Sequence, residues 1–259
     1  MLDSSRSASA GAARPSFRSA GAILAFTATA LPRVAAAQPP DPALIQRISH
    51  QIDTLGDLEK RASFREEQLT EEVDGDGKVA SAETRVSRVE ADGKTSHKIL
   101  EQCTKDGKDV TAEERAKAEK GAKSNEKNVK KEKKDEESLS IDPPFSSSSN
   151  DYVYDQIATD LTYPTRVEIA FTPKKPNSRT VEGTAWVDTA SGTLLTAGAK
   201  LSKPPAFVDW IHFTVEFGAN TPLGPAMSRI GFEVKGGFLF FIRKHVRGEV
   251  KMTDYRIAP

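Results

Sequence analysis

Cysteine is almost absent from this chain of 259 residues, since Cys103 is the only one. One cysteine excludes an intramolecular disulfide, and its place in an alternating segment favours a half-buried strand residue over a catalytic nucleophile. Net charge is absent as well, because 37 basic residues balance 37 acidic ones. The chain as a whole therefore creates no electrostatic field that would attract nucleic acid.

Motifs of enzymes and metal sites are also missing. The four histidines, His50, His97, His212 and His245, include no pair at the spacing of zinc ligands. The sequence contains no Gly-x-Ser-x-Gly elbow, no Walker loop and no dinucleotide fingerprint. We therefore expect neither enzymatic activity nor a cofactor.

The apolar run at residues 20–31 is too short to cross a bilayer, and no other segment is long enough. Arg6, Arg14 and Arg18 precede this run, and three alanines at positions 35–37 follow it. This layout is typical of a secretory signal peptide, the alternative being a disordered alanine-rich tail. It predicts cleavage after Ala37 and a periplasmic or otherwise exported domain of residues 38–259 that does not span the membrane.

Residues 43–55 place Leu44, Ile48, Ile52 and Leu55 at helical spacing, which predicts an amphipathic helix that ends near Gly56. Its single apolar stripe must pack against another secondary-structure element, most simply a sheet.

A period of two then predicts strands at residues 64–73, 79–89 and 95–103. Asp-Gly pairs at positions 74–77, 92–93 and 106–107 supply the positive φ values that tight hairpin turns need.

Residues 111–137 begin with the capping-box sequence Thr-Ala-Glu-Glu and are about two-thirds charged, with almost no apolar stripe. They predict a solvated helix inserted between strands. The alternatives are a surface for an outer-membrane or periplasmic protein partner, or for anionic lipid headgroups. Nucleic acid is disfavoured, because aromatic residues are absent and acidic residues interleave. The prolines and serines of residues 143–150 predict a flexible joint.

The second half of the chain reads as consecutive strands, with no alternation of strand and helix. We predict a tight turn at Gly236-Gly237 and a bulge or bend at Gly248. The fold class is therefore α+β, with a large curved antiparallel sheet wrapped over the N-terminal helix. The predicted strands start at residue 152 and continue at 166–171, 180–188, 193–202, 209–217, 227–235 and 238–255.

One segment nearly fits a calcium loop. Glu72, Asp74, Asp76 and Glu83 fall on positions 1, 3, 5 and 12 of an EF-hand loop. The flanks alternate like strands, whereas an EF-hand needs helices on both sides. A metal-free hairpin turn is the favoured interpretation, and calcium binding at a protein surface is the alternative.

The order of these parts over residues 43–257 resembles the periplasmic lipoprotein-carrier-like proteins, the LolA/LolB-like superfamily. The resemblance rests on the helix at 43–55, Asp-Gly-Lys turns at 76–78, 92–94 and 106–108, Val-Thr-Ala-Glu-Glu at 110–114, Gly-Thr-Ala-Trp-Val-Asp at 183–188, Ser-Gly at 191–192 and Thr-Asp-Tyr at 253–255. The resemblance implies an incomplete β-barrel with a hydrophobic cavity for acyl chains, a part in outer-membrane biogenesis, and no catalytic activity.

Large apolar residues on the C-terminal strands are the candidate lining of such a cavity, although each of them also suits plain core packing. The preferred hypothesis is an exported carrier for a lipid or an acylated protein, and the alternative is an interaction module that uses the charged helix. The candidate lining residues are Phe171, Trp186, Phe213, Phe217, Phe232 and Phe240.

Overall fold

The computed structural model describes residues 37–128, 141–147, 151–238 and 242–257. The chain divides into two units, Met1–Leu31 and Pro32–Pro259, and every described element belongs to the second. Residues 1–36 of the predicted signal peptide, the end of the predicted charged helix and the candidate Phe240 lie outside the described residues.

Helix α1 (Pro42–Arg61) confirms the first predicted helix but runs beyond Gly56, where we expected its end. Asp41 caps its first turn by accepting a backbone hydrogen bond of 2.9 Å. The apolar stripe buries Ile48 and continues to Leu58, which is 6% exposed. Burial of this last turn outweighs the helix-weakening effect of a single glycine.

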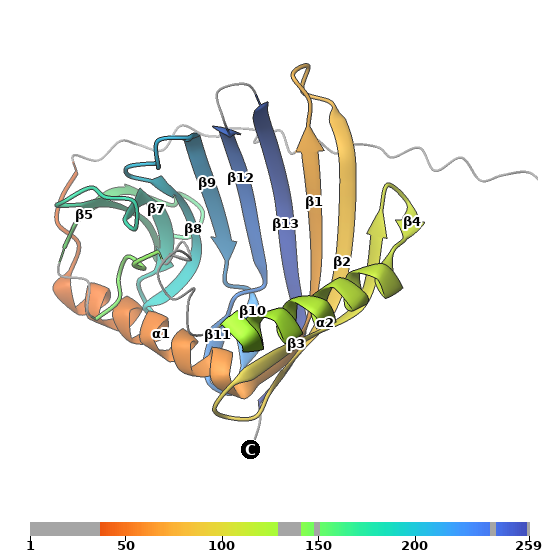
Figure 1. Ribbon diagram of the computed structural model, residues 1–259. Coiled ribbons are helices and arrows are strands. Elements are labelled where there is room, and N and C mark those ends of the chain that lie inside the picture. The colour runs from red at the N-terminus through yellow and green to blue at the C-terminus, as the bar shows by residue number, and fades with distance from the viewer. Residues whose placement is uncertain (1–36, 129–140, 148–150, 239–241, 258–259) are drawn as a thin grey trace, which may run out of the picture. The chain divides into compact units, whose positions relative to one another are not determined.

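Eleven strands form one antiparallel sheet in the order β4-β3-β2-β1-β13-β12-β9-β8-β7-β6-β5 (Figure 1). Two short strands, β10 (Ala219–Thr221) and β11 (Gly224–Ala226), form a separate hairpin. The strands of the large sheet are β1 (Ala62–Val73), β2 (Val79–Ala91), β3 (Ser96–Lys105), β4 (Lys108–Asp109), β5 (Tyr152–Thr159), β6 (Arg166–Pro173), β7 (Val181–Asp188), β8 (Thr193–Leu201), β9 (Val208–Glu216), β12 (Arg229–Phe238) and β13 (Ile242–Ile257).

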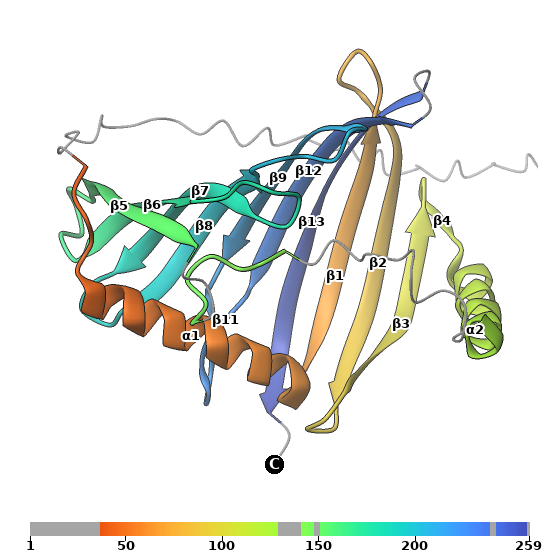
Figure 2. The same ribbon diagram turned by 60° about the vertical axis from the view of Figure 1, so that its left-hand side comes forward.

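The sheet is open, because β4 and β5 at its two ends are not paired with each other. Figure 2 shows the sheet curving, with α1 running across one of its faces. Helix α2 (Thr111–Asn128) follows β4 and precedes β5, so the charged helix is inserted between strands as predicted. An α+β fold with a curved, unclosed antiparallel sheet therefore agrees with the expected class.

Two glycine predictions are wrong. Gly236 and Gly237 do not form a turn, since both belong to β12 and pair with Lys244 and Arg243 of β13. A Cβ at Gly236 would lie 2.6 Å from the carbonyl oxygen of Phe207. Glycine therefore allows the backbone of the neighbouring segment to approach closely there.

Gly248 also lies in regular register, opposite Phe232 and Thr70, and forms no bulge. A Cβ there would lie 2.4 Å from the ring of Phe232. Glycine at this position makes room for an aromatic ring on the neighbouring strand.

The main hydrophobic core lies between α1 and the β5–β9 end of the sheet. Ile48, Ile169 and Val187 are fully buried within it. A smaller cluster around Leu58, Ala62 and Ala226 closes the other end of α1. The sheet face toward α1 is called the inner face below, and the opposite face is called the outer face.

Candidate functional site

A cavity of about 820 Å³ lies between α1, residues 141–145 and the inner face of the sheet. Seventeen residues line it, and none has a polar side chain. Its volume falls in the range of about 300–1,000 Å³ that is typical of small-molecule sites. We call it the apolar cavity.

Strand register explains why the inner face is both apolar and roomy. Ile169, Ala185, Ala197, Val215 and Ile230 are direct partners across five neighbouring strands, so their side chains share one face. Of the two alanines in this row, Ala197 lines the apolar cavity, as does Ala199 two residues further along β8. Their small side chains leave space above the sheet that a larger aliphatic residue would fill.

Residues 141–147 form a segment, here called the strap, that covers part of the apolar cavity. Phe145 in the strap is 2% exposed and has a φ of 67°. Its ring stacks on Tyr154 at 4.8 Å and meets Phe171 edge-on at 5.5 Å. Its N–H donates to the Tyr154 hydroxyl at 3.1 Å. This part of the predicted flexible joint is therefore packed into the core, because one aromatic residue among prolines and serines anchors it.

Two neighbours hold the strap at its beginning. Arg179 forms an ion pair of 2.9 Å with Asp142, and its carbonyl oxygen accepts the Asp142 N–H at 2.9 Å. The Tyr152 hydroxyl donates to the Asp142 carbonyl at 3.4 Å and accepts the N–H of Val181 at 3.2 Å. Tyr152 thereby links the strap to β7.

Burial raises the pKa of Tyr152 above its ordinary value. This shift predicts that the free energy of unfolding falls at alkaline pH. Stability that depends on the neutral phenol is complete below the pKa of the unfolded chain, near 10, and is lost as pH rises through the higher folded pKa. Between about pH 10 and 11 the native protein should therefore lose more unfolding free energy than Tyr152→Phe. Urea titrations at pH 8, 10 and 11 measure this, and equal losses in both proteins would contradict it.

Three of the six candidate lining residues line the apolar cavity together, namely Phe171, Phe213 and Phe217. Trp186 does not, because it pairs with Glu168 and Thr196 on the outer face. The neighbouring buried residues of β7 point the opposite way.

Phe232 lies on the inner face opposite Phe213, yet it packs over Gly248 and does not line the cavity. Helix α1 and the strap also line the cavity, through Leu55, Ile141 and Phe145 among others, and none of these was among the predicted lining residues. The helical stripe indicated Leu55 as buried, but nothing in the strap sequence indicated contact with a cavity.

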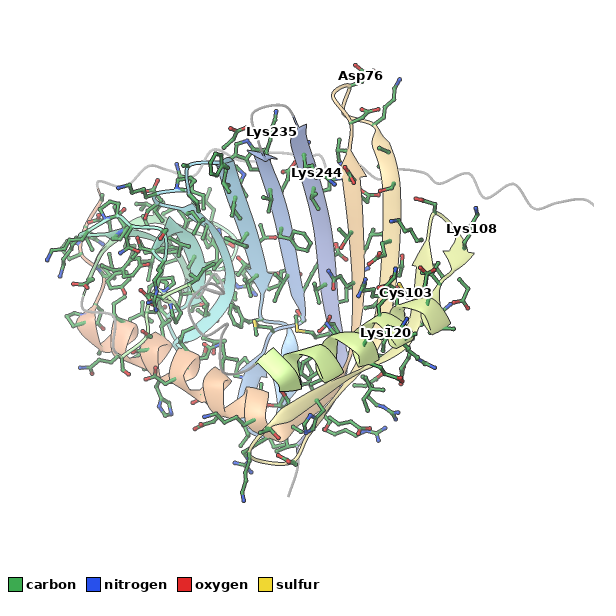
Figure 3. The ribbon with its side chains drawn as sticks, viewed as in Figure 1. Asp76, Cys103, Lys108, Lys120, Lys235 and Lys244 are labelled. Carbon is green, nitrogen blue, oxygen red and sulfur yellow. The ribbon has the colours of Figure 1, made fainter. Side chains whose placement is uncertain are left out.

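The four candidate calcium ligands, Glu72, Asp74, Asp76 and Glu83, do not form a common metal site. The Asp74 carboxylate accepts the backbone N–H groups of Asp76 and Lys78 within its own turn, at 2.9 and 2.8 Å. Figure 3 shows Asp76 at the tip of the β1–β2 hairpin. Glu72 pairs with Lys244, and Glu83 pairs with Arg85. Within the described ranges, no group of three or more His, Cys, Asp or Glu residues could hold a metal ion.

Helix α2 is joined to β3 through its first turn. The Thr111 hydroxyl donates to the Cys103 carbonyl and accepts its N–H, so it does not cap its own helix as the capping box predicts. Cys103 of β3, labelled in Figure 3, is fully buried, rather than half-buried as expected. Burial raises the pKa of its thiol. The Arg115 guanidinium donates to the carbonyls of Leu100 and Glu101.

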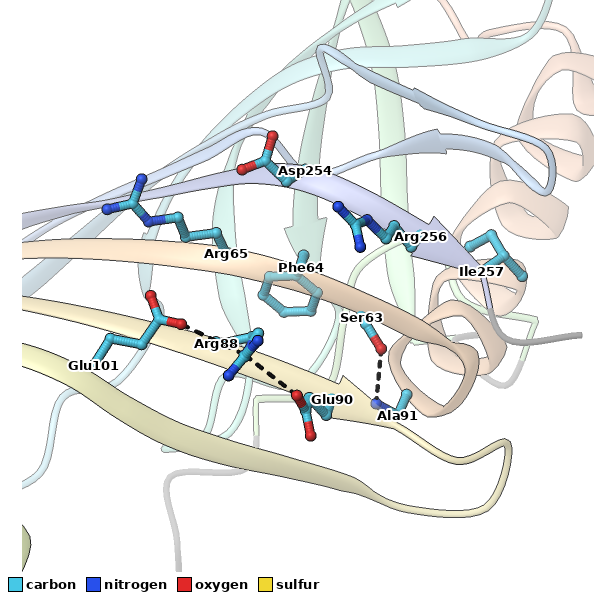
Figure 4. A pocket seen from close by; sticks show the side chains of 10 residues that line it. All are labelled: Ser63, Phe64, Arg65, Arg88, Glu90, Ala91, Glu101, Asp254, Arg256 and Ile257. Atoms are coloured by element: carbon cyan, nitrogen blue, oxygen red, sulfur yellow. Dashed lines mark hydrogen bonds and ion pairs between the residues drawn. The ribbon is translucent and has the colours of Figure 1, made fainter.

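A second hollow, of about 520 Å³, lies where β1, β2 and the end of β13 meet. Its charged residues are three arginines and three carboxylates, which compensate one another (Figure 4). Arg88 pairs with Glu90 at 3.2 Å and with Glu101 at 3.5 Å. The formal charges that line this hollow therefore sum to zero.

No protein-family model matches the chain, and no curated protein matches it. Among solved structures, the crystal structure of MucB in complex with MucA(peri) matches with a TM-score of 0.20 and 10% identity, over 82% of this chain and 99% of that chain. A TM-score of this size supports no argument about fold or function. The resemblance to lipoprotein carriers therefore stays a prediction. Among the described residues, no helix has the length and hydropathy needed to span a membrane.

Proposed function

We propose that this chain is an exported, non-enzymatic binding protein that holds the alkyl chain of a lipid or of an acylated partner in the apolar cavity. The observation that carries the proposal is the lining of this cavity by seventeen residues without a polar side chain. Such a surface favours apolar ligands, because a buried polar group would find no side-chain partner there. The signal-peptide pattern at the N-terminus supports the exported location.

Filling the apolar cavity should abolish ligand binding without unfolding the protein. Ala197 lines the cavity at the centre of β8, so Ala197→Phe places a ring where the ligand would lie. Affinity for a fluorescent fatty acid should fall by at least about tenfold, because a filled site loses the buried apolar contact area. Fluorescence titration measures the affinity, and thermal unfolding reports the fold.

Thr196→Phe is the matched control, because the exposed Thr196 lies on the outer face next to Ala197 in the same strand. It should bind the fatty acid as the native protein does. Equal affinity of native protein and a folded Ala197→Phe would place any binding elsewhere, and no binding by the native protein at micromolar concentrations would refute the proposal.

An interaction module built on α2 is the second candidate. The observation that favours it is the exposure of Glu113, Lys117 and Lys120 on α2. The hydrogen bonds described above between this helix and the sheet come from its first five residues. Deleting residues 116–137 should leave fatty-acid binding intact if the cavity is the functional site. Loss of a bound partner protein together with unchanged fatty-acid binding would favour the module.

A further inference from the structure

A polar pocket of about 640 Å³ lies on α1 beside the apolar cavity. One face of α1, the turn at residues 191–193 and the β10–β11 hairpin line it. None of its twelve lining residues is Asp or Glu, whereas Arg47, His50 and Gln51 all contribute to it. A donor-rich lining without carboxylates suits a negatively charged or oxygen-rich group.

Arg47 is held in a defined position at this pocket. Its Nη2 donates to the Thr189 carbonyl at 3.0 Å. Its stem crosses Gly192, where an added Cβ would lie 2.6 Å from the Arg47 Cβ and Nε. A guanidinium carries five N–H donors, so this single bond leaves others for a ligand. Planar donors fixed in this way match the oxygens of a carboxylate or a phosphate.

Gln51 supplies an independent indication. Its Oε1 accepts the Leu194 N–H at 2.7 Å, which fixes the amide group. Its Nε2 is buried and has no hydrogen-bond partner, and no other buried side-chain nitrogen or oxygen in the described part of the chain is in this state. Buried donors normally have a hydrogen-bond acceptor, and an acceptor atom of a ligand would supply the one that Gln51 Nε2 lacks.

The polar pocket and the apolar cavity are lined by neighbouring residues. Gln51 lines the pocket and Ile52 lines the cavity, and the same division separates Thr193 from Leu194. One turn of α1 and the start of β8 therefore contribute residues to both the polar pocket and the apolar cavity.

We propose that the polar pocket binds the anionic head group, a phosphate or a carboxylate, of an amphiphile whose alkyl chain lies in the apolar cavity. The inference rests on the proposed function above and narrows its ligand to anionic amphiphiles. Arg47 provides the positive charge, and the Nε2 of Gln51 provides a hydrogen-bond donor that gains its acceptor when the ligand binds.

Three probes that share a sixteen-carbon chain and differ in their head group test the proposal directly. Hexadecyl phosphate, hexadecanoate and hexadecanol compete against a fluorescent apolar probe on the purified protein. The two anions should bind about tenfold or more tightly than the alcohol, since a hydrogen bond to a charged group contributes more than a neutral one. Equal affinity for all three would overturn the head-group assignment and leave the cavity intact.

Gln51→Glu is the sharpest variant, because it keeps an acceptor for the Leu194 N–H and replaces the free donor with a negative charge. It should weaken the two anions by about tenfold or more and leave hexadecanol unchanged. Arg47→Met, which keeps an apolar stem, should act in the same direction. Arg61→Met, an exposed arginine at the far end of α1, is the control and should change nothing.

The outcomes separate the two proposals. A preference for anions that disappears in Gln51→Glu supports the head-group site, and a preference that survives in both variants refutes it. If none of the three amphiphiles binds, the proposed function fails. Calorimetry with inorganic phosphate then decides the source of the anion: binding that Gln51→Glu removes would assign the pocket to a free anion and overturn its role as a head-group site.

Discussion

Replacing Phe145 with alanine is expected to lower the free energy of unfolding by about 3–5 kcal/mol, the range found for buried phenylalanines. The ring is 2% exposed and is held between Tyr154 and Phe171. Its loss would open a void between the strap and the sheet and would free the strap from the core. Chemical denaturation of the native protein and Phe145→Ala measures the difference.

Phe207→Ala is the matched control for this prediction. The side chain of Phe207 is 58% exposed, so its removal should change the unfolding free energy by no more than about 0.5 kcal/mol. Similar losses in the two variants would show that Phe145 is not a core residue. The strap would then be a loose loop, as the sequence alone suggests.

Gly183→Ala is expected to destabilise the protein by about 2–3 kcal/mol, at the upper end of the usual overpacking cost. A Cβ at Gly183 would lie 1.9 Å from the carbonyl oxygen of Gly198 and 2.8 Å from the Cα of Ala199. Both contacts are with backbone atoms, which cannot move aside without disturbing the pairing of β7 with β8. The loss should appear as a lower denaturation midpoint.

Gly198→Ala provides a control on the neighbouring strand. No atom outside Gly198 and its two chain neighbours lies within 4 Å of a Cβ built there, and the φ of Gly198 is not in the left-handed region. This substitution should be neutral, or should stabilise by about 0.4–1 kcal/mol through the entropy of the unfolded chain. A larger loss from Gly198→Ala than from Gly183→Ala would contradict the described packing of β7 and β8.

Local signals predicted the hairpins of the first half well. The predicted Asp-Gly turns place Gly77, Gly93 and Gly107 at φ values of 81°, 87° and 77°. Glycine adopts such values without strain, so the residue type alone marks each turn. Period-two alternation between the turns then determined the strands they join.

The apolar cavity could be predicted only in part, because it depends on contacts between distant segments. Side-chain size selected Trp186 as a lining residue, whereas its position in β7 places it on the outer face. The space itself arises where the small side chains of Ala197 and Ala199 on β8 line the cavity, and no local sequence pattern indicates which segments lie across from them. Phe145 enters the core through a segment without periodicity, so the strap had no recognisable signal.

The central claim is that the apolar cavity holds an alkyl chain. Native mass spectrometry of the protein, recovered without detergent from cells that export it, tests this claim most directly. We predict a mass increment that collisional activation releases as a molecule with a long alkyl chain, and Ala197→Phe should lack it. A native protein that carries no such molecule, and acquires none when incubated with hexadecanoate, would contradict the claim.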